Sequence, residues 1–429
     1  MKLKDNQKVK IQTGGEATVL CTLGEGGQGI VYKVNYSGKE YALKWYHTAG
    51  KPEFYNNLKN NINKDAPDKR FLWPLFLTEK DREGCYGYLM ELRNPVYREF
   101  SDFLLAKVQF SSVEAMIEAG IKICVGFRKL HNAGYSYQDL NDGNFFINPQ
   151  NGDVLICDND NVAPFGENTG ILGKCRYMAP EVVTGATRPN AQTDRFSLAV
   201  ILFLLFFNNH PLEGEQIVSY PCMTEKHEKK FYGTHPVFIY DPVDDSNRPV
   251  AGIHVNVISL WKQFPGYVRD IFIDQFGKEA LHNPGLRITE KEWLNRVLLP
   301  MRHDLVRCPS CGGEIFAHAE DIYPCDDCGQ QLQRLPMIQS GNFKIHIFER
   351  KEIYQYVTNA SKPLLNTCTG MVVESKKRPG VYGLRNLTGD TWMLTTKSGT
   401  ARPIAPQEVA PLLVGNTLSF GNGTEATIV

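Results

Sequence analysis

Long apolar runs and an excess of charge of either sign are both missing from this sequence. The longest apolar stretch, FSLAVILFLLFF at residues 196–207, is shorter than the ~20 residues that cross a bilayer, so it predicts a buried core helix. Lys and Arg together number 47, as do Asp and Glu, which favours neither a nucleic-acid partner nor a membrane surface. No apolar segment follows the basic start MKLKDNQKVK, so we expect no secretory signal.

Cysteines patterned for a disulfide framework are also absent. Four of the eleven cysteines form a group near the C-terminus. The others are scattered through apolar or mixed segments, at Cys21, Cys85, Cys124, Cys157, Cys175, Cys222 and Cys368. Because seven is odd and the chain is long, we expect free thiols in a reducing cytosol, and therefore a cytoplasmic protein.

Internal repeats and low-complexity linkers are missing as well, and at ~150 residues per domain the length suggests about three domains. Residues 18–78 are rich in predicted strands around a glycine turn, with one helix predicted from Pro52. From residue 113 onward helical periodicity dominates, and VEAMIEAGIKICVGFRKLHNAG predicts a helix that ends near Gly134. A strand-rich part followed by a helix-rich part indicates two lobes.

A glycine-rich turn separates the first predicted strands. LGEGGQGIVYKV contains G-x-G-x-x-G as Gly24, Gly26 and Gly29. Glycines let backbone N–H groups approach phosphates without a Cβ in the way. Lys44 follows in YALKWY, where an apolar strand requires a partner for its charge. The next predicted helix offers only one acid, Glu53, as that partner.

Oxygen-bearing side chains recur in a fixed order farther along. YSYQDLNDGNFF carries Asp139 and Asn144, and VLICDNDN carries Asp158. Carboxylate and amide oxygens are ligands that suit Mg²⁺. Each acid alone is more often a surface residue, but the order Gly-rich turn, Lys44, Asp139, Asn144, Asp158 is hard to obtain by chance.

This ordered set resembles the eukaryotic-type (Hanks-type) Ser/Thr protein kinase family over residues 20–299. The resemblance implies that Asp139 accepts or orients the proton of the attacking hydroxyl and that Asn144 and Asp158 bind Mg²⁺. It implies a catalytic set of Lys44, Asp139, Asn144 and Asp158. The implied ATP site comprises Gly24, Gly26, Gly27, Gly29, Val31, Lys44, Glu53, Met90, Glu91, Asn144 and Asp158.

Three further residues match structural parts of that family. Glu181, in YMAPEVV, ends the activation segment and is expected to pair with Arg287 of NPGLRIT. Asp194, at the head of the apolar run, is expected to brace the catalytic loop. A small-molecule kinase of related fold remains an alternative, but Glu181 and Arg287 argue for a protein-substrate platform.

The catalytic loop departs from the family pattern at Gln138, where the family has an arginine that reads a phosphate on the activation segment. Without that arginine, phosphorylation there loses its electrostatic partner. The segment between Asp158 and Glu181 is also short. We therefore predict activity that does not depend on phosphorylation, for example of Thr169.

Other departures lie next to the metal-binding positions. Asn141 replaces a lysine that offsets γ-phosphate charge, which could lower the rate. Asn159 and Asp160 replace the Phe and Gly of the Asp-Phe-Gly motif. The leading interpretation is an ATP- and Mg²⁺-dependent Ser/Thr kinase with a loop of the non-Arg-Asp type, and the alternative is a nucleotide-binding pseudokinase scaffold.

Two Cys-x-x-Cys pairs stand near the C-terminus, separated by thirteen residues and each followed by glycine. The pairs are Cys308 with Cys311 and Cys325 with Cys328. This spacing predicts one structural Zn²⁺ held by four thiolates, in an arrangement that resembles a zinc ribbon. A four-thiolate site is closed, so catalysis there is not expected, and the acidic residues of the segment argue against nucleic-acid binding.

The last ninety residues predict a small β-sandwich, with strands in KIHIFER, TGMVVES, TWMLTT and TLSFGNG. The turn RNLTGDTW and the closing GNTLSFGNG resemble the C-terminal half of a forkhead-associated domain. Such domains bind phosphothreonine peptides. Arg385 and Lys397 could contact a phosphate, but we expect solvated surface charges.

The expected fold class is α+β, with a bilobal kinase fold followed by two small modules. Expected domains are a kinase domain at 1–300 (lobes about 1–92 and 93–300), a zinc ribbon at 301–338 and a forkhead-associated-like sandwich at 339–429. The layout resembles bacterial kinases of tellurium-resistance-type phosphorylation systems. That resemblance implies protein substrates, and as further partners a metal-dependent protein phosphatase and a von Willebrand A-like protein.

Overall fold

The computed structural model describes residues 2–168, 170, 173–317 and 322–429, so Thr169 lies outside the described residues. The chain divides into two compact units, Met1–Leu298 and Leu299–Val429. Within the described residues, no helix is long and apolar enough to cross a membrane.

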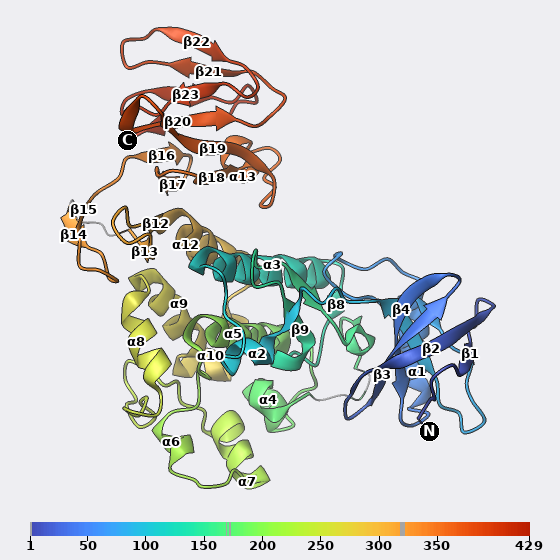
Figure 1. The fold of residues 1–429 in the computed structure, drawn as a ribbon. Coiled ribbons are helices and arrows are strands. Elements are labelled where there is room, and N and C mark those ends of the chain that lie inside the picture. The colour runs from blue at the N-terminus through green and yellow to red at the C-terminus, as the bar shows by residue number, and fades with distance from the viewer. Residues whose placement is uncertain (1, 169, 171–172, 318–321) are drawn as a thin grey trace. The chain divides into compact units, whose positions relative to one another are not determined.

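The first unit begins with an antiparallel sheet in the order β1-β2-β3-β4-β6-β5. Figure 1 shows β1 to β4 of this sheet in blue. Its strands are β1 (Lys8–Lys10), β2 (Glu16–Glu25), β3 (Gly29–Tyr36), β4 (Lys39–Tyr46), β5 (Phe76–Leu77) and β6 (Gly87–Glu91). Helix α1 (Pro52–Ile62) begins at its proline, which suits the first helical turn because the missing N–H has no partner there. The predicted strands around the glycine turn and the predicted helix are confirmed.

Helices form most of the rest of this unit. The long helices are α3 (Val113–Asn132), α5 (Ala191–Phe207), α8 (Val255–Gln263) and α9 (Gly266–Phe276). The shorter helices are α2 (Phe100–Leu104), α4 (Pro180–Val183), α6 (Glu215–Val218), α7 (Glu225–Glu228), α10 (Lys278–His282) and α11 (Glu290–Trp293). The apolar run forms α5, which is buried on nearly all sides and packs against α3, so the predicted core helix is confirmed.

Short strands and turns position the polar loops between these helices. The strands are β7 (Arg98–Glu99), β8 (Tyr135–Ser136), β9 (Phe145–Ile147), β10 (Val154–Ile156) and β11 (Ala163–Pro164). β9 pairs with β10, so the loop before β9 and the turn after β10 lie at the same end of this ribbon. That turn is the 3-10 helix η2 (Asn159–Asn161).

The second unit starts with α12 (Leu299–Asp304) and two small hairpins. Their strands are β12 (Leu305–Arg307), β13 (Glu314–Phe316), β14 (Ile322–Pro324) and β15 (Gln331–Gln333). One buried cluster in this part contains Cys308 and Cys325 together with Val306, Ile315, Tyr323 and Leu332. These two cysteines therefore belong to its core.

Two antiparallel sheets make up the remainder, in the orders β17-β16-β25-β24-β21-β22 and β18-β19-β20-β23. The first contains β16 (Met337–Ser340), β17 (Phe343–His346), β21 (Trp392–Thr395), β22 (Ala401–Ile404), β24 (Thr417–Ser419) and β25 (Glu425–Ile428). The second contains β18 (Glu352–Tyr354), β19 (Cys368–Ser375), β20 (Arg378–Asn386) and β23 (Val409–Pro411), and helix α13 (Gln355–Thr358) follows β18. A Cβ on Gly370 would lie 3.3 Å from the Trp392 ring, so the two sheets pack face to face.

The boundary before the sandwich differs from the expected residue 339. β16 begins at Met337 and pairs with both β17 and β25, so the sheet starts within the segment assigned to the ribbon. No linker separates the two parts, and composition alone therefore did not mark the boundary. Arg385 and Lys397 are both exposed, as expected for surface charges.

Candidate functional site

A cleft of about 480 Å³ lies in the first unit, within the range of 300–1,000 Å³ that is usual for ligand sites. Five of the sequence-predicted ATP-site residues line it: Gly24, Val31, Met90, Glu91 and Asp158. The rest of the wall is largely apolar and includes Ala42, Leu72 and Phe146. The sequence did not single out these apolar residues, because nothing in their local pattern distinguishes a cleft wall from ordinary core.

The glycine turn joins β2 to β3 beside this cleft. A Cβ on Gly29 would lie 2.3 Å from the Trp45 carbonyl oxygen, so only glycine allows β3 to pair closely with β4 there. Cβ atoms added to Gly24 or Gly27 would meet no described atom within 4 Å. Gly26 donates its backbone N–H to the Gly29 carbonyl at 2.9 Å, which closes the turn. Side chains therefore leave room for a ligand above the turn.

Lys44 is buried, with 4% of its surface exposed. Its Nζ donates to both carboxylate oxygens of Asp160, at 2.9 and 3.2 Å, and to Asp158 Oδ1 at 3.2 Å. A third partner is Gln28 of the glycine turn, whose Oε1 accepts from Nζ at 3.1 Å. Burial alone would lower the pKa of Lys44, but the charges and hydrogen bonds of Asp160 and Asp158 outweigh it and raise the pKa, so the ammonium stays charged.

The ion pair expected between Lys44 and Glu53 is not formed among the described residues. Glu53 lies exposed in the first turn of α1, whereas the positions of α1 that are buried are Asn57, Leu58 and Asn61. Pro52 starts the helix directly before Glu53, so Glu53 lies at the solvent-exposed N-terminal end of α1. The structure therefore corrects the assignment of Glu53 as the partner of Lys44.

Asp160 is the functional-site residue that sequence reasoning missed. Its side chain is fully buried and accepts hydrogen bonds from the hydroxyls of Tyr46 at 2.5 Å and Tyr88 at 3.3 Å, besides those from Lys44. Burial and the charge of Asp160 raise the pKa of both tyrosines well above the usual value, so both remain protonated donors. The available signal was a second carboxylate two residues after Asp158.

The catalytic loop is held from below by Asp194, at the start of α5. Asp194 accepts the backbone N–H groups of Tyr137 at 2.6 Å and Gln138 at 3.0 Å, and contacts His131 Nε2 at 3.1 Å. Glu290 contacts the other ring nitrogen of His131 at 2.9 Å. The bracing role expected for Asp194 is confirmed by these contacts.

Asp139 is half-buried and surrounded by amides. Asn141 Nδ2 donates to its Oδ1 at 3.2 Å and Asn161 Nδ2 to its Oδ2 at 3.4 Å, while Asn144 Nδ2 donates to its backbone carbonyl at 2.6 Å. Burial and the charge of Asp158 raise the pKa of Asp139, against the hydrogen bond from Asn141 and the charge of Lys174. A raised pKa suits a carboxylate that must accept or share a proton.

Asn144 and Asp158 fit a hard cation. Because Asn144 Nδ2 is used by the Asp139 carbonyl, its Oδ1 remains available, and within the described part of the chain it accepts no hydrogen bond. The Asp158 side chain is 35% exposed and lines the cleft. Two carboxylates beside the single ammonium of Lys44 leave one negative charge in excess, which favours a cation there.

Gln138 connects the catalytic loop to the segment that follows η2 through neutral contacts. Its Nε2 donates to Ser136 Oγ at 2.9 Å and to the Glu167 carbonyl at 2.7 Å, and its Oε1 accepts from Asn168 Nδ2 at 2.8 Å. Gln138 itself is 4% exposed. Farther along, Arg287 binds Glu181 through two 2.7 Å contacts, so that expected pair is confirmed.

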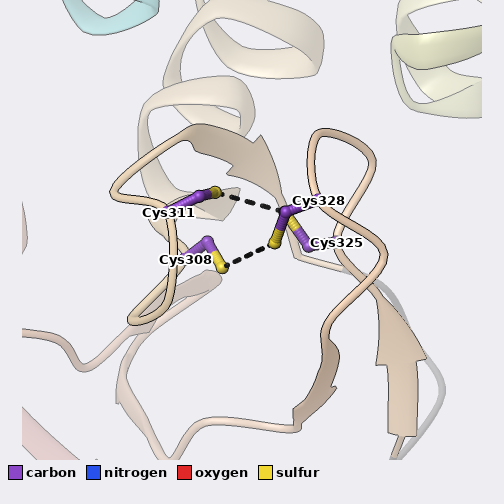
Figure 2. Close-up of side chains that lie close together, drawn as sticks. All are labelled: Cys308, Cys311, Cys325 and Cys328. Carbon is purple, nitrogen blue, oxygen red and sulfur yellow. Dashed lines mark hydrogen bonds between the residues drawn. The ribbon is translucent and has the colours of Figure 1, made fainter.

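The four cysteines near the C-terminus form a separate candidate metal site in the second unit. Figure 2 shows them facing one another from two knuckles, and all four sulfurs lie within 4.8 Å of one another. The contacts of Cys308 with Cys328 and of Cys311 with Cys325 are both 3.8 Å. Sulfurs placed tetrahedrally at ~2.3 Å from Zn²⁺ are ~3.8 Å apart, so the spacing fits zinc.

Glycine at the same place in each knuckle allows this arrangement. Gly312 and Gly329 have φ of +75° and +72°, a conformation that other residues adopt only with strain. Their N–H groups donate to the carbonyls of Cys308 and Cys325, at 2.8 and 2.9 Å. The two knuckles are therefore alike in hydrogen bonding as well as in sequence.

Comparison with known proteins places the first unit. The model of the protein kinase domain matches residues 17–236, more than half of the chain. Mitogen-activated protein kinase 5 of Oryza sativa subsp. indica is 24% identical over 322 residues, which are 68% of this chain and 80% of that protein. Protein kinase YegI of Escherichia coli (strain K12) is 26% identical over 235 residues, which are 51% of this chain and 36% of that protein. The chain therefore belongs to the protein kinase domain family and is a protein kinase.

Proposed function

We propose that this kinase transfers the γ-phosphoryl group of ATP to Ser/Thr hydroxyls of proteins and requires Mg²⁺ for the transfer. The observation that carries the proposal is the juxtaposition, at one cleft, of a buried lysine and an accessible aspartate. Lys44 Nζ lies 3.2 Å from Asp158 Oδ1, and the charge of Asp158 helps to raise the pKa of Asp139. These are the groups that phosphoryl transfer needs for positioning and charge stabilisation.

Each residue has a defined task in this reaction. The acceptor hydroxyl oxygen forms a bond to the γ-phosphorus, the bond from that phosphorus to the β,γ-bridging oxygen breaks, and ADP leaves. Asp139 orients the hydroxyl and receives its proton, and Lys44 holds the α/β-phosphates. Asn144 and Asp158 would hold Mg²⁺, which would offset charge on the phosphates.

Lys174 supplies the cation that the catalytic loop lacks at Asn141. Lys174 Nζ lies 3.5 Å from Asp142 Oδ1, and a Cβ on Gly143 would lie 3.7 Å from it. A Cβ on the preceding Gly173 would lie 3.2 Å from Asp139 Oδ1, so this segment passes directly over the catalytic loop. An exposed ammonium in that position can approach the transferred phosphoryl group.

The kinase is active without phosphorylation of its activation segment. The support is that Gln138 holds residues 167 and 168 by amide hydrogen bonds, which need no phosphate. A phosphate added near Gln138 would find a neutral amide in place of an arginine.

The test is intact mass measurement after incubation with ATP and Mg²⁺, with a generic basic protein as acceptor. We expect phosphate on Ser/Thr of wild type or acceptor and none with the Asp158→Asn variant. No phosphate on either, with ADP still raising the melting temperature, would favour the pseudokinase scaffold. Labelling of a metabolite but of no protein would favour a small-molecule kinase.

The second unit serves partner recognition, with Zn²⁺ held by Cys308, Cys311, Cys325 and Cys328. The support is the closed four-sulfur geometry and a sandwich of two antiparallel sheets, as in forkhead-associated domains. Phosphothreonine peptides, a metal-dependent phosphatase and a von Willebrand A-like protein are the partners to test first.

A further inference from the structure

The two carboxylates that contact Lys44 differ in what else they can do. Asp160 is fully buried and uses both of its oxygens on the Lys44 ammonium, while two tyrosine hydroxyls occupy its remaining acceptor sites. Asp158 offers one oxygen to Lys44 and is 35% exposed at the cleft. One carboxylate is therefore committed to the lysine, and the other stays available to the cleft.

Helix α1 offers no carboxylate for the same purpose. Glu53 is the only acid between Pro52 and Ile62, and it is exposed. The buried amides of Asn57 and Asn61 both donate to the Val162 carbonyl at 2.8 Å. α1 is thus fastened to the segment just after η2 by neutral hydrogen bonds, and none of the contacts described for Lys44 comes from α1.

The three residues of η2 connect the separate parts of the site. Asn159 Nδ2 donates to the carbonyls of Leu72 and Ile156, both at 2.9 Å, which fixes the turn to its surroundings. Asp160 holds Lys44, and Asn161 reaches the carboxylate of Asp139. A single short turn therefore fixes the lysine and touches the catalytic base.

Resting on the function proposed above, we propose that Asp160 is the residue that positions Lys44 for the nucleotide phosphates, in place of a glutamate on helix α1. The lysine is then aligned by a carboxylate of the turn that carries Asp158, and not by a charged residue of α1. Asp160 acts through Lys44 and touches neither nucleotide nor metal.

The first test compares Asp160→Asn with a matched buried aspartate. Asp68 is also buried and ion-paired, to Arg70 at 2.7 Å and to Lys129 at 2.7 Å, but it does not line the cleft. We expect Asp160→Asn to lower kcat roughly 10- to 100-fold and to weaken ADP binding about 5-fold, because a charge-assisted contact to the phosphate-binding group is lost. Asp68→Asn should lower the melting temperature but leave kcat and ADP affinity within about twofold.

The second test measures melting temperatures and does not require kinase activity. It still tests the role of Asp160 if the single variant Asp160→Asn folds poorly. In Lys44→Met, Asp160 is a buried carboxylate without its cation, so the melting temperature should fall by roughly 5 °C. Adding Asp160→Asn removes that unpaired charge and should recover most of the loss, whereas adding Glu53→Gln should recover none. The transition followed is the one that ADP raises in the wild-type full-length chain.

Three results would overturn the proposal. One is Asp160→Asn with wild-type kcat and ADP affinity. Another is loss of ADP affinity in Glu53→Gln as large as in Asp160→Asn, which would assign the lysine to α1 after all. The third is a double variant Lys44→Met/Asp160→Asn that melts below Lys44→Met. If wild type transfers no phosphate, the proposed function fails, but ADP affinity and the melting cycle still decide the role of Asp160.

Discussion

Lys44 and Gln138 are held in opposite ways. Lys44 matches the pattern of the family but its acidic partner does not, whereas Gln138 itself departs from that pattern. At Lys44 a full ion pair is present. Its carboxylate is that of Asp160, in the turn after Asp158, and not one on helix α1. At Gln138 the charge is gone, and three neutral hydrogen bonds connect the catalytic loop to residues 136, 167 and 168. In the proposed function, the ion pair that would serve phosphoryl transfer is kept with a different carboxylate, whereas the arginine charge that would read a regulatory phosphate is absent.

This difference argues for retained catalysis with altered control. A buried ion pair is costly unless it is well satisfied, and the pair at Lys44 is satisfied by two carboxylates and further hydrogen bonds. Neutral amides at Gln138 carry no such cost and no response to phosphate.

Removing a retained charge should have the largest effect. Asp158→Asn keeps the size of the side chain but weakens the ligand for Mg²⁺, so we expect kcat to fall ~1,000-fold or more. The measurement is the initial rate of phosphate transfer to a peptide. ADP binding without Mg²⁺ should stay close to wild type, and a variant with more than a tenth of wild-type kcat would contradict the assigned ligand.

The charge of His131, which contacts Asp194 behind the catalytic loop, should make the free energy of unfolding depend on pH. Burial lowers the pKa of His131, but hydrogen bonds and charges of Asp194 and Glu290 outweigh it and raise the pKa to about 9. Because the folded pKa exceeds the unfolded value, this stabilisation is complete below pH ~6.5 and is lost as the pH rises through 9, at a cost of roughly 3 kcal/mol.

Denaturant unfolding of wild type and His131→Gln between pH 6 and 9 measures this contribution. The two free energies of unfolding should converge as the pH rises, because only wild type loses a charged imidazole. A difference that stays constant over this range would show that His131 is neutral in the folded protein.

In the proposed function, Lys174 supplies the cation missing at Asn141, and its effect should be smaller because the side chain is exposed. We expect Lys174→Ala to lower kcat about tenfold with little change in ADP affinity, and Lys174→Arg to retain most activity. Lys8 forms a comparable surface pair with Glu16 at 3.2 Å, so Lys8→Ala is the matched control and should leave kcat unchanged. Equal rates for both alanine variants would exclude a catalytic role for Lys174.

The four-cysteine site should have the smallest effect on transfer. Its ligands are all thiols in the second unit, and no described residue of the cleft belongs to that unit. We expect native mass spectrometry to show one Zn²⁺ per chain in wild type and none in Cys325→Ser. Loss of the metal should destabilise the two hairpins around the site. Peptide phosphorylation should stay within about twofold of wild type, and a tenfold loss would connect the zinc site to catalysis.

The sequence predicted those parts of the site that depend on order along the chain. The order of the glycines, Lys44, Asp139, Asn144 and Asp158 predicts one site. The structure places Lys44 Nζ 3.2 Å from Asp158 Oδ1 and joins Asn144 to the Asp139 carbonyl by a hydrogen bond, while the catalytic and metal-binding roles stay predictions. Helix and strand patterns likewise predicted α1, α3 and α5, because strong periodicity, Pro52 at a helix start and Gly134 after a helix end are local signals.

The missed parts depend on distances between segments far apart in the chain. Asp160 and Lys44 are separated by more than a hundred residues, and a carboxylate in place of the motif glycine resembles a loss more than a gain. Glu53 was favoured because it was the only acid in the following helix, but sequence alone did not show that Pro52 leaves it at the exposed end. The contacts of Gln28 and Lys174 were missed for the same reason.

Activity without phosphorylation is tested most directly by the rate at which enzyme that carries no phosphate phosphorylates a peptide. Wild type would be treated with a phosphatase, verified as unphosphorylated by intact mass, and assayed at once with ATP and Mg²⁺. We predict a linear time course without a lag, at a rate within about twofold of the autophosphorylated enzyme, because Gln138 needs no phosphate to hold the activation segment. An inactive start followed by acceleration as phosphate accumulates would contradict the account.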